Sequence, residues 1–289
     1  MVPRVSSYMS SPVYVVRPED SLAYARNLML KRGIGRLVVV GDGYEPVGII
    51  TYTDIARALM EVFPERPIES ILVEEVMTEN PITITSTRGL NTAAHVMLKH
   101  KISGLPVIDR SGSLIGIITK TDIVRAFSER YKGVYKVADI ARKGATTAKP
   151  GHSIRHILNL SLLDPAGKVV IVDEEGKPIG IIARRDLAFL RWTPELAARK
   201  GREAYVKRKI VDPGRDRLVA YRVYSIPLAN DIMTEDPLTV KPDDDAALAA
   251  GLMVKEGIGA LPVTSEKGVL MGIVTKNEIL QAVITGSKH

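Results

Sequence analysis

The chain of 289 residues contains no cysteine and only one glutamine, Gln281. The absence of cysteine excludes disulfides, thiolate metal sites and cysteine nucleophiles. No apolar run is long enough to span a membrane, and Arg4 is followed by polar serines where a signal peptide would have its hydrophobic region. We therefore expect a cytoplasmic protein, and the scarcity of cysteine and glutamine is typical of a thermophile.

Sequence motifs of catalysis are also missing: the chain has no nucleophile elbow, P-loop or kinase signature. The segment around Gly33 and Gly35 lacks the third glycine of a dinucleotide-binding turn and precedes a strand instead of following one. His152 and His156 have helical spacing, but neither the glutamate of a metalloprotease motif nor a third ligand is near them in the sequence. We expect no catalytic residue and no metal site, and hence a regulator or adaptor.

The composition is that of a globular protein with an excess of positive charge. Apolar residues make up 45% of the chain and charged residues 25%, which is the usual balance of a folded soluble protein. The length is sufficient for two domains, each with its own core. The net charge of +7 favours an acidic partner, such as a nucleotide or a nucleic acid.

One segment occurs four times, and landmarks precede it at constant distance. The four copies are GIITYTDI at 48–55, GIITKTDI at 116–123, GIIARRDL at 180–187 and GIVTKNEI at 272–279. The landmarks in repeats two and four are Met77 and Met233 of Met-Thr-x-x-Pro segments, and Pro106 and Pro262 of Leu-Pro-Val strands. Repeats one and three have Val38 and Val170 in place of that proline, and repeat three has no Met-Thr-x-x-Pro segment. Such internal repetition predicts a repeat architecture.

Each copy predicts a short strand, a helix, two strands and a second helix, which is an α/β unit of the order βαββα. A unit of about 60 residues buries too little surface to be stable alone, so the copies should pair. Two pairs give two domains, which we place at residues 1–132 for repeats one and two and at residues 133–289 for repeats three and four.

The Met-Thr-x-x-Pro starts, the Leu-Pro-Val strands and the four Gly-Ile-Ile-Thr-like segments resemble the CBS-domain family, named after cystathionine β-synthase. The resemblance covers the chain except for roughly residues 191–224. It implies α+β CBS units, two of which form a Bateman module, with clefts that bind adenosine compounds such as AMP, ADP or ATP. Four units in one chain are similar to the nucleotide-sensing γ subunit of AMP-activated kinase and its archaeal relatives.

The recurring segment has two compatible interpretations. Thr51 and Asp54 have the spacing of a capping box, in which a hydroxyl and a carboxylate close the first turn of a helix. The same helix start also suits a ligand, because its open amides favour phosphate and its carboxylate can accept hydrogen bonds from both hydroxyls of a ribose. The segment can therefore cap a helix and hold a nucleotide.

The family resemblance assigns roles within this segment: the aspartate holds the ribose, and the threonine three residues earlier meets the phosphate. Adenine would lie against Val15 in repeat one, or against Ile82, Thr83 and Pro106 in repeat two. The expected nucleotide-binding residues are Thr51, Thr53, Asp54, Ile82, Thr83, Pro106, Thr119, Thr121, Asp122, Asp186, Thr275 and Glu278.

Repeats three and four depart from the pattern. Repeat three keeps Asp186 but has Ala183 and Arg185 where repeats one and two have hydroxyls, so it loses a hydroxyl and gains a cation. Repeat four has Glu278, whose longer side chain must retract to hold the same diol. We rank the four sites, from best to worst, as those of repeats two, one, four and three.

Residues 191–224 do not repeat and form a basic insertion. They contain ten basic and four acidic residues, which is +6 of the net charge of +7, interleaved with Trp192 and three tyrosines. A short helix and a β-hairpin are expected here, with cations for RNA phosphates and aromatics for base stacking. The expected polyanion-binding residues are Arg199, Lys200, Arg202, Lys207, Arg208, Lys209, Arg215, Arg217 and Arg222.

These features predict a non-catalytic regulator that couples adenine nucleotide occupancy to RNA or the ribosome through the insertion. One alternative is an energy-sensing subunit of a protein partner with no nucleic-acid role, in which the insertion docks an acidic protein. The basic insertion can also be interpreted as a solvated, charged surface of a thermophile protein. A homodimer is a further candidate partnership of the chain.

Overall fold

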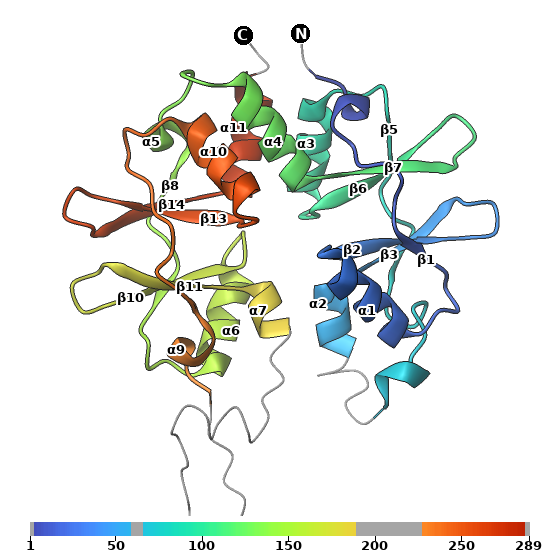
Figure 1. The fold of residues 1–289 in the computed structure, drawn as a ribbon, viewed down its shortest axis with the longest axis horizontal. Coiled ribbons are helices and arrows are strands. Elements are labelled where there is room, and N and C mark those ends of the chain that lie inside the picture. The colour runs from blue at the N-terminus through green and yellow to red at the C-terminus, as the bar shows by residue number, and fades with distance from the viewer. Residues whose placement is uncertain (1–2, 59–65, 189–226, 287–289) are drawn as a thin grey trace, which may run out of the picture.

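The computed structural model describes residues 3–58, 66–188 and 227–286, and it places four copies of one α+β unit side by side in two columns (Figure 1). Repeat one consists of β1 (Val15–Val16), α1 (Leu22–Arg32), β2 (Arg36–Val40), β3 (Pro46–Thr51) and α2 (Tyr52–Arg57). Repeat two consists of β5 (Ile84–Thr85), α3 (Leu90–Lys99), β6 (Gly104–Ile108), β7 (Leu114–Thr119) and α4 (Lys120–Arg130).

The second column holds repeats three and four. Repeat three consists of β9 (Thr147–Ala148), α6 (Ile154–Leu163), β10 (Lys168–Val172), β11 (Pro178–Ala183) and α7 (Arg184–Ala188). Repeat four begins with a single bridge at Val240 and continues with α10 (Ala246–Lys255), β13 (Ala260–Thr264), β14 (Leu270–Thr275) and α11 (Lys276–Gly286). The predicted order of elements is therefore confirmed.

The short segment before each repeat joins the sheet of the neighbouring repeat, and we call it the exchanged segment. β4 (Thr78–Glu79) precedes repeat two but pairs with β3 of repeat one, and Ser10, which precedes repeat one, bridges Ile117 of repeat two. In the other column β8 (Arg142–Lys143) pairs with β14 of repeat four, and β12 (Thr234–Glu235) pairs with β11 of repeat three. This exchange links repeats one and two, and likewise repeats three and four. The boundary at residues 132 and 133 stays a prediction.

A short helix leads into each exchanged segment. These helices are η1 (Val5–Ser7), η3 (Ile68–Ser70), α5 (Val137–Ile140) and α9 (Ala229–Ile232). The third residue of α5 is Asp139 and that of α9 is Asp231. Each carboxylate accepts a hydrogen bond from the backbone N–H of the residue that precedes its helix. Repeat three therefore has a leading segment of the same kind, although it lacks the Met-Thr-x-x-Pro sequence.

The leading glycine of each recurring segment makes room for the exchanged segment. A Cβ on Gly48 or Gly180 would collide with the sulfur of Met77 or Met233, and one on Gly116 would lie 2.7 Å from the sulfur of Met9. In repeat four, a Cβ on Gly272 would lie 2.5 Å from the backbone oxygen of Arg142. In three repeats the leading glycine thus makes a close contact with a methionine of the exchanged segment, and in repeat four the backbone of Arg142 takes the place of the methionine.

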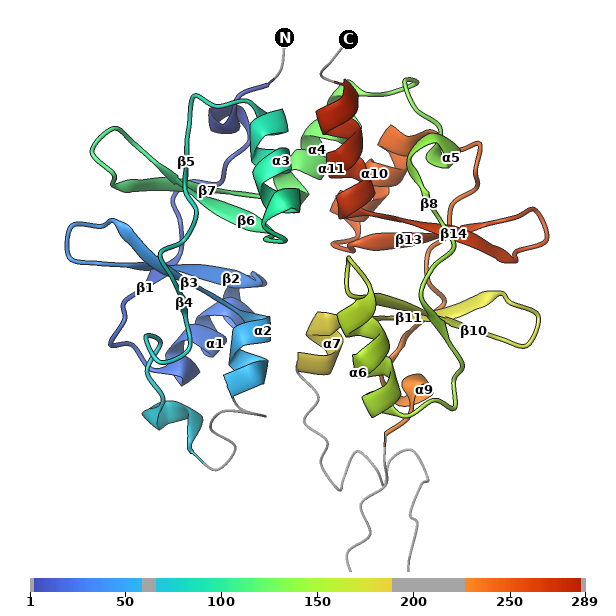
Figure 2. The same cartoon turned by 180° about the vertical axis from the view of Figure 1, so that it is seen from behind.

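The largest apolar core is shared by repeats two and four. It includes Phe127 of α4, Met97 of α3 and Met253 of α10, all fully enclosed, and the four helices α3, α4, α10 and α11 meet between the two columns (Figures 1 and 2). Repeats one and three have separate cores, and α2 faces α7 between them. The two columns are therefore held together mainly through repeats two and four.

Candidate functional site

The recurring segment of repeat two forms a complete helix cap. Asp122 accepts hydrogen bonds through Oδ2 from the backbone N of Thr119 at 2.8 Å and from its Oγ1 at 2.7 Å. The other oxygen, Oδ1, accepts from Arg125 Nη2 at 2.7 Å. Asp122 is only 6% exposed, so this carboxylate lies inside the protein at the start of α4.

Repeat one has the same arrangement, which confirms the capping-box interpretation for both repeats. Asp54 Oδ2 accepts from Thr51 N at 2.9 Å and from Thr51 Oγ1 at 2.7 Å. Its Oδ1 lies 3.9 Å from Arg57 Nη2, on the next turn of the same helix.

Repeats three and four keep the carboxylate but change its surroundings. Asp186 accepts from the backbone N of Ala183 at 2.7 Å, and no hydroxyl accompanies that amide. Glu278 accepts from the backbone N of Thr275 at 2.8 Å and from its hydroxyl, so its longer side chain is retracted onto the helix start.

A cleft of about 360 Å³ opens beside Asp122. Its walls come from the exchanged segment of repeat one, from the turn between α1 and β2, and from the end of β7 with the start of α4. Residues that line it include Ser10, Val13, Tyr14, Arg36, Thr121 and Asp122. An acid, three serine or threonine residues, an aromatic ring and a cation thus line one small space.

The cleft contains some of the residues predicted for it and several that sequence reasoning missed. Thr119, Thr121 and Asp122 line it, whereas Ile82, Thr83 and Pro106 are not among its lining residues. Pro106 lies on β6 opposite Ile117, and Ile82 follows β4, the strand that joins repeat one. The side of the cleft opposite Asp122 comes instead from residues 10–14. They overlap the Met-Ser-Ser-Pro sequence at residues 9–12, which is a shortened form of the Met-Thr-x-x-Pro landmark.

Two of the missed residues bring chemistry to the cleft. The Arg36 guanidinium donates to the backbone oxygen and to Oγ of Ser103, and its Nε has no hydrogen-bond partner in the described part of the chain. Burial lowers the pKa of Arg36 to about 10, and the Asp122 carboxylate opposes this shift. The Arg32 guanidinium makes a cation–π contact with Tyr14, its carbon lying 4.6 Å from the ring centroid.

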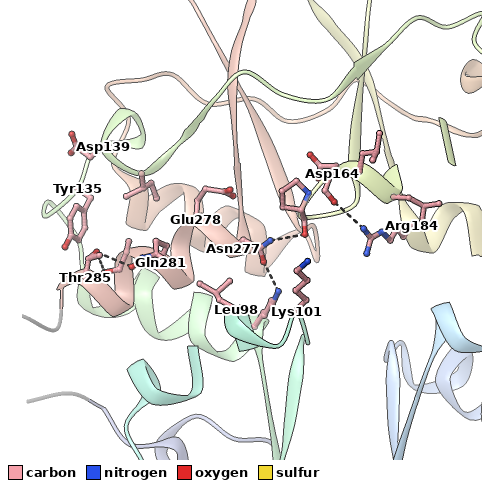
Figure 3. A pocket seen from close by; sticks show the side chains of 16 residues that line it. Leu98, Lys101, Tyr135, Asp139, Asp164, Arg184, Asn277, Glu278, Gln281 and Thr285 are labelled. Atoms are coloured by element: carbon pink, nitrogen blue, oxygen red, sulfur yellow. Dashed lines mark hydrogen bonds between the residues drawn. The ribbon is translucent and has the colours of Figure 1, made fainter. Parts of the chain in front are cut away.

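A larger cavity of about 800 Å³ lies between the two columns (Figure 3). Lys101, Lys120 and Arg184 line it together with Asn277 and Glu278 of α11. Figure 3 shows Asp164 and Arg184 at one end of this space, Asn277 and Glu278 in the middle, and Tyr135 and Thr285 at the other end. Burial lowers the pKa of Lys120 to about 8, the nearby charges of Arg36 and Arg184 add to the decrease, and Glu278 opposes it.

The starts of α4 and α11 are cross-linked by two reciprocal hydrogen bonds. Lys120 Nζ donates to Asn277 Oδ1 at 2.7 Å, and Lys276 Nζ donates to Thr121 Oγ1 at 2.7 Å. Thr121 is one of the predicted nucleotide-binding residues, so a lysine of the second column touches the cleft of the first.

Other predicted features lie elsewhere or outside the described residues. The basic insertion 191–224, with all nine predicted polyanion-binding residues, falls outside them. His152 and His156 stack edge to face with ring centroids 4.6 Å apart, and the described residues contain no group of three or more potential metal ligands. Within the same ranges, no helix is both long and apolar enough to cross a membrane.

Comparison with known proteins identifies a family. The family described as CBS domain matches residues 5–61, 73–129, 137–191 and 229–285. The chain is 25% identical over 281 residues to the uncharacterized protein MJ1225 of Methanocaldococcus jannaschii, covering 93% of this chain and 94% of that protein. It is 38% identical over 122 residues to inosine-5'-monophosphate dehydrogenase of Korarchaeum cryptofilum, but spans only 24% of that enzyme.

Two solved structures share the fold over nearly the whole chain. MJ1225, described as a candidate archaeal homologue of γ-AMPK, has a TM-score of 0.75 at 24% identity, covering 96% of this chain and 99% of its own. An uncharacterized conserved protein from Pyrococcus horikoshii has a TM-score of 0.67 at 19% identity, covering 97% and 100%. At these identities the likeness concerns the fold.

Proposed function

The chain belongs to the CBS-domain family, with four CBS domains along its length, and on that premise we propose that it is a non-catalytic regulatory protein that binds adenine nucleotides. The observation that carries the proposal is the cleft beside Asp122. It combines a carboxylate at a helix start, the hydroxyls of Thr119 and Thr121, and a cation, Arg36, within about 360 Å³. We place the protein in the cytoplasm.

The cleft offers a partner for each part of a nucleotide. Asp122 Oδ1 can accept from the ribose hydroxyls once Arg125, whose side chain is 45% exposed, turns toward solvent. The amides at the start of α4 and the Thr121 hydroxyl suit a phosphate. Val13 and the ring of Tyr14 provide an apolar surface for the base. Thr51, Thr53 and Asp54 supply the same groups at the start of α2 in repeat one.

A nucleotide in the Asp122 cleft can affect the contact between the two columns. A phosphate that bonds Thr121 would compete with or recruit Lys276, which belongs to the other column. Lys120 and Arg184 line the central cavity and provide further positive charge for phosphates. Because the central lysines join the two columns, a change in their bonding alters the interface through which a partner can read the nucleotide state.

The nature of that partner has two candidate answers. The fold shared with MJ1225 supports an energy-sensing regulatory subunit of a protein partner, since that relative is described as a candidate homologue of γ-AMPK. The concentration of +6 of the net charge in residues 191–224 supports RNA or the ribosome instead. We favour the polyanion because it accounts for a segment that the repeats do not need.

A salt-dependent binding assay tests the polyanion. Replacing Lys207, Arg208 and Lys209 by Ser should weaken co-sedimentation with RNA or ribosomes and flatten its dependence on salt, because each phosphate contact contributes about 0.7–0.9 to the log–log slope. Nucleotide affinity at the Asp122 cleft should not change. If the triple variant binds ribosomes as well as the parent chain does, or if neither binds at low salt, an acidic protein partner becomes the better hypothesis.

The nucleotide proposal itself is tested by identifying what the protein carries. Purified protein is denatured, and the released small molecules are analysed by mass spectrometry, followed by calorimetric titration with AMP, ADP, ATP and GMP as a base control. We expect an adenine nucleotide to be released or to bind with measurable heat. Absence of both release and heat for all three adenine nucleotides would contradict the proposal.

A further inference from the structure

The cleft of repeat four differs from the others at the residue that enters from the exchanged segment. In each repeat one such residue lies opposite the isoleucine that follows the leading glycine of the recurring segment. It is a small hydroxyl residue in three of the repeats, Ser10, Thr78 and Thr234, and it is Arg142 in repeat four. A long cation therefore replaces a short hydroxyl in this cleft alone.

Arg142 is tied to a buried acid. Its Nη2 donates to Oδ2 of Asp164 at 2.7 Å, and the Asp164 side chain is 0% exposed. Asp164 also accepts from Thr146 Oγ1 and from the backbone N–H groups of Ala166 and Lys168. Asp164 is the residue that ends α6. The corresponding helices of repeats one and four, α1 and α10, are instead followed by glycines with positive φ. The anchor is therefore particular to repeat three, which forms one wall of this cleft.

On its other side, the Arg142 guanidinium faces the carboxylate of the recurring segment. Arg142 Nε lies 4.0 Å from Oε1 of Glu278, is buried, and has no hydrogen-bond partner among the described residues. Glu278 is the one glutamate at a position that is aspartate in the other three repeats. The arginine thus spans from the end of α6 to the start of α11, the space that is an open cleft beside Asp122 in the first column.

The arginines beside the other carboxylates are differently placed. Arg57 and Arg125 come from the same helix as Asp54 and Asp122, and their side chains are 58% and 45% exposed. They can turn outward when ribose hydroxyls take their place on Oδ1, since Oδ2 of each aspartate keeps its hydrogen bonds from the threonine of the same cap. Arg142 cannot, because its departure would leave Asp164 unpaired in the interior, which is strongly unfavourable.

We propose that Arg142 closes the nucleoside cleft of repeat four, so that the chain loads adenine nucleotides in its other clefts only. Both Asp164 and Glu278 also line the large central cavity, whereas Arg142 does not, so the proposed closure concerns the side of these two carboxylates on which the guanidinium lies. This inference rests on the proposed function and adds to it which cleft is excluded and why.

Photo-crosslinking of the unaltered full chain tests the closure directly. The chain is irradiated with 8-azido-AMP, and the labelled peptides are mapped by mass spectrometry. We expect label at residues 10–14, in the Asp122 cleft, and none at residues 142–146. Label at 142–146 would overturn the inference while leaving the proposed function intact, whereas absence of label anywhere, together with absence of calorimetric heat, would overturn both.

A gain of binding provides the complementary test. The variant Arg142→Thr/Asp164→Asn installs the threonine that enters the sheets of repeats one and three, and it removes both charges of the buried pair together. We expect its AMP stoichiometry to rise by one equivalent over that of the parent chain. Lys143→Thr, an exposed change on the same strand, is the control and should add none. If the double variant keeps its fold by circular dichroism and gains no equivalent, the closure is wrong; if it does not fold, the crosslinking map decides.

Discussion

At Asp122 the carboxylate that caps a helix is also the group that we propose to bind the ribose. Its Oδ2 is used by Thr119, so the capacity left for a ribose is on Oδ1, where an exposed arginine from the same helix now sits. Asp164 uses the same chemistry for stability alone, since both of its oxygens are satisfied within the protein. The two carboxylates therefore differ in their proposed roles because of what surrounds the second oxygen: an exposed arginine at Asp122, and backbone N–H groups at Asp164.

Asp164→Asn should destabilise the protein in a way that depends on pH. Burial alone would raise the pKa of Asp164, but the hydrogen bonds from Arg142, Lys168 and Thr146 outweigh it and hold the pKa below its usual range. The stabilisation is thus complete above about pH 4, the unfolded value, and is lost as the pH falls through the folded pKa. We expect a loss of about 2 kcal/mol at pH 7, typical of a hydrogen bond to a charged group, and a smaller difference at pH 3.

Urea unfolding at the two pH values measures this loss. Asp243→Asn is the matched control, because Asp243 also pairs with a cation at 2.7 Å, Lys136, but its side chain is 85% exposed. The control should change stability little. An equal loss in the two variants, or an Asp164→Asn loss that grows toward pH 3, would contradict the account.

Nucleotide affinity should fall between pH 7 and pH 9 because of Lys120. Burial holds its pKa at about 8, so the free protein loses this charge over that interval, and a phosphate in the central cavity loses a cation partner. Calorimetric titration with ATP at both pH values measures the change. Lys120→Arg keeps its charge above pH 9 and should remove the part of the pH dependence that Lys120 causes. An unaltered pH dependence in that variant would exclude Lys120 from phosphate binding.

At the scale of the elements, much of the fold could be predicted from the sequence. The order of strands and helices follows from patterns repeated four times, and Val38 and Val170 occupy the strand positions of Pro106 and Pro262, as expected. The exchanged segments could not be placed, because a strand of two residues carries no periodic signal that says which sheet it joins. Hence Ile82 and Thr83 were expected near Asp122, where the structure has residues 10–14.

Because the exchanged segments pack closely against the leading glycines, replacing these glycines by alanine should destabilise the fold. Gly272→Ala should destabilise more than Gly48→Ala, because its Cβ would meet the backbone oxygen of Arg142, whereas that of Gly48 would meet the flexible end of Met77. Overpacking typically costs about 1–3 kcal/mol, and we expect Gly272→Ala near the upper end and Gly48→Ala near the lower. Thermal and urea unfolding compare the two variants. The reverse order would mean that β8 does not approach β14 as closely as described.

At the scale of the whole molecule, two columns of paired repeats meet through the helices of repeats two and four (Figures 1 and 2). Lys120 and Lys276 at the starts of α4 and α11 each donate a hydrogen bond to the other column. The sequence indicates four sites and ranks them by the residues of one segment, but it cannot show that Lys276 of repeat four touches Thr121 of repeat two. That contact depends on how the columns pack. If the clefts bind nucleotides as we propose, this contact provides a route by which ligand at one site can change another.

Titration of the protein with AMP, comparing the parent chain with Asp122→Ala, tests the central claim most directly. Loss of hydrogen bonds to a charged carboxylate costs about 1.5–3 kcal/mol, so affinity at this cleft should fall about tenfold to a hundredfold. Asp231→Ala removes a capping carboxylate of the same geometry from α9, outside the cleft, and should leave affinity unchanged. Binding of AMP that is equally tight in the parent chain and in Asp122→Ala, or no binding of AMP, ADP or ATP to the parent chain, would contradict the assignment of this cleft.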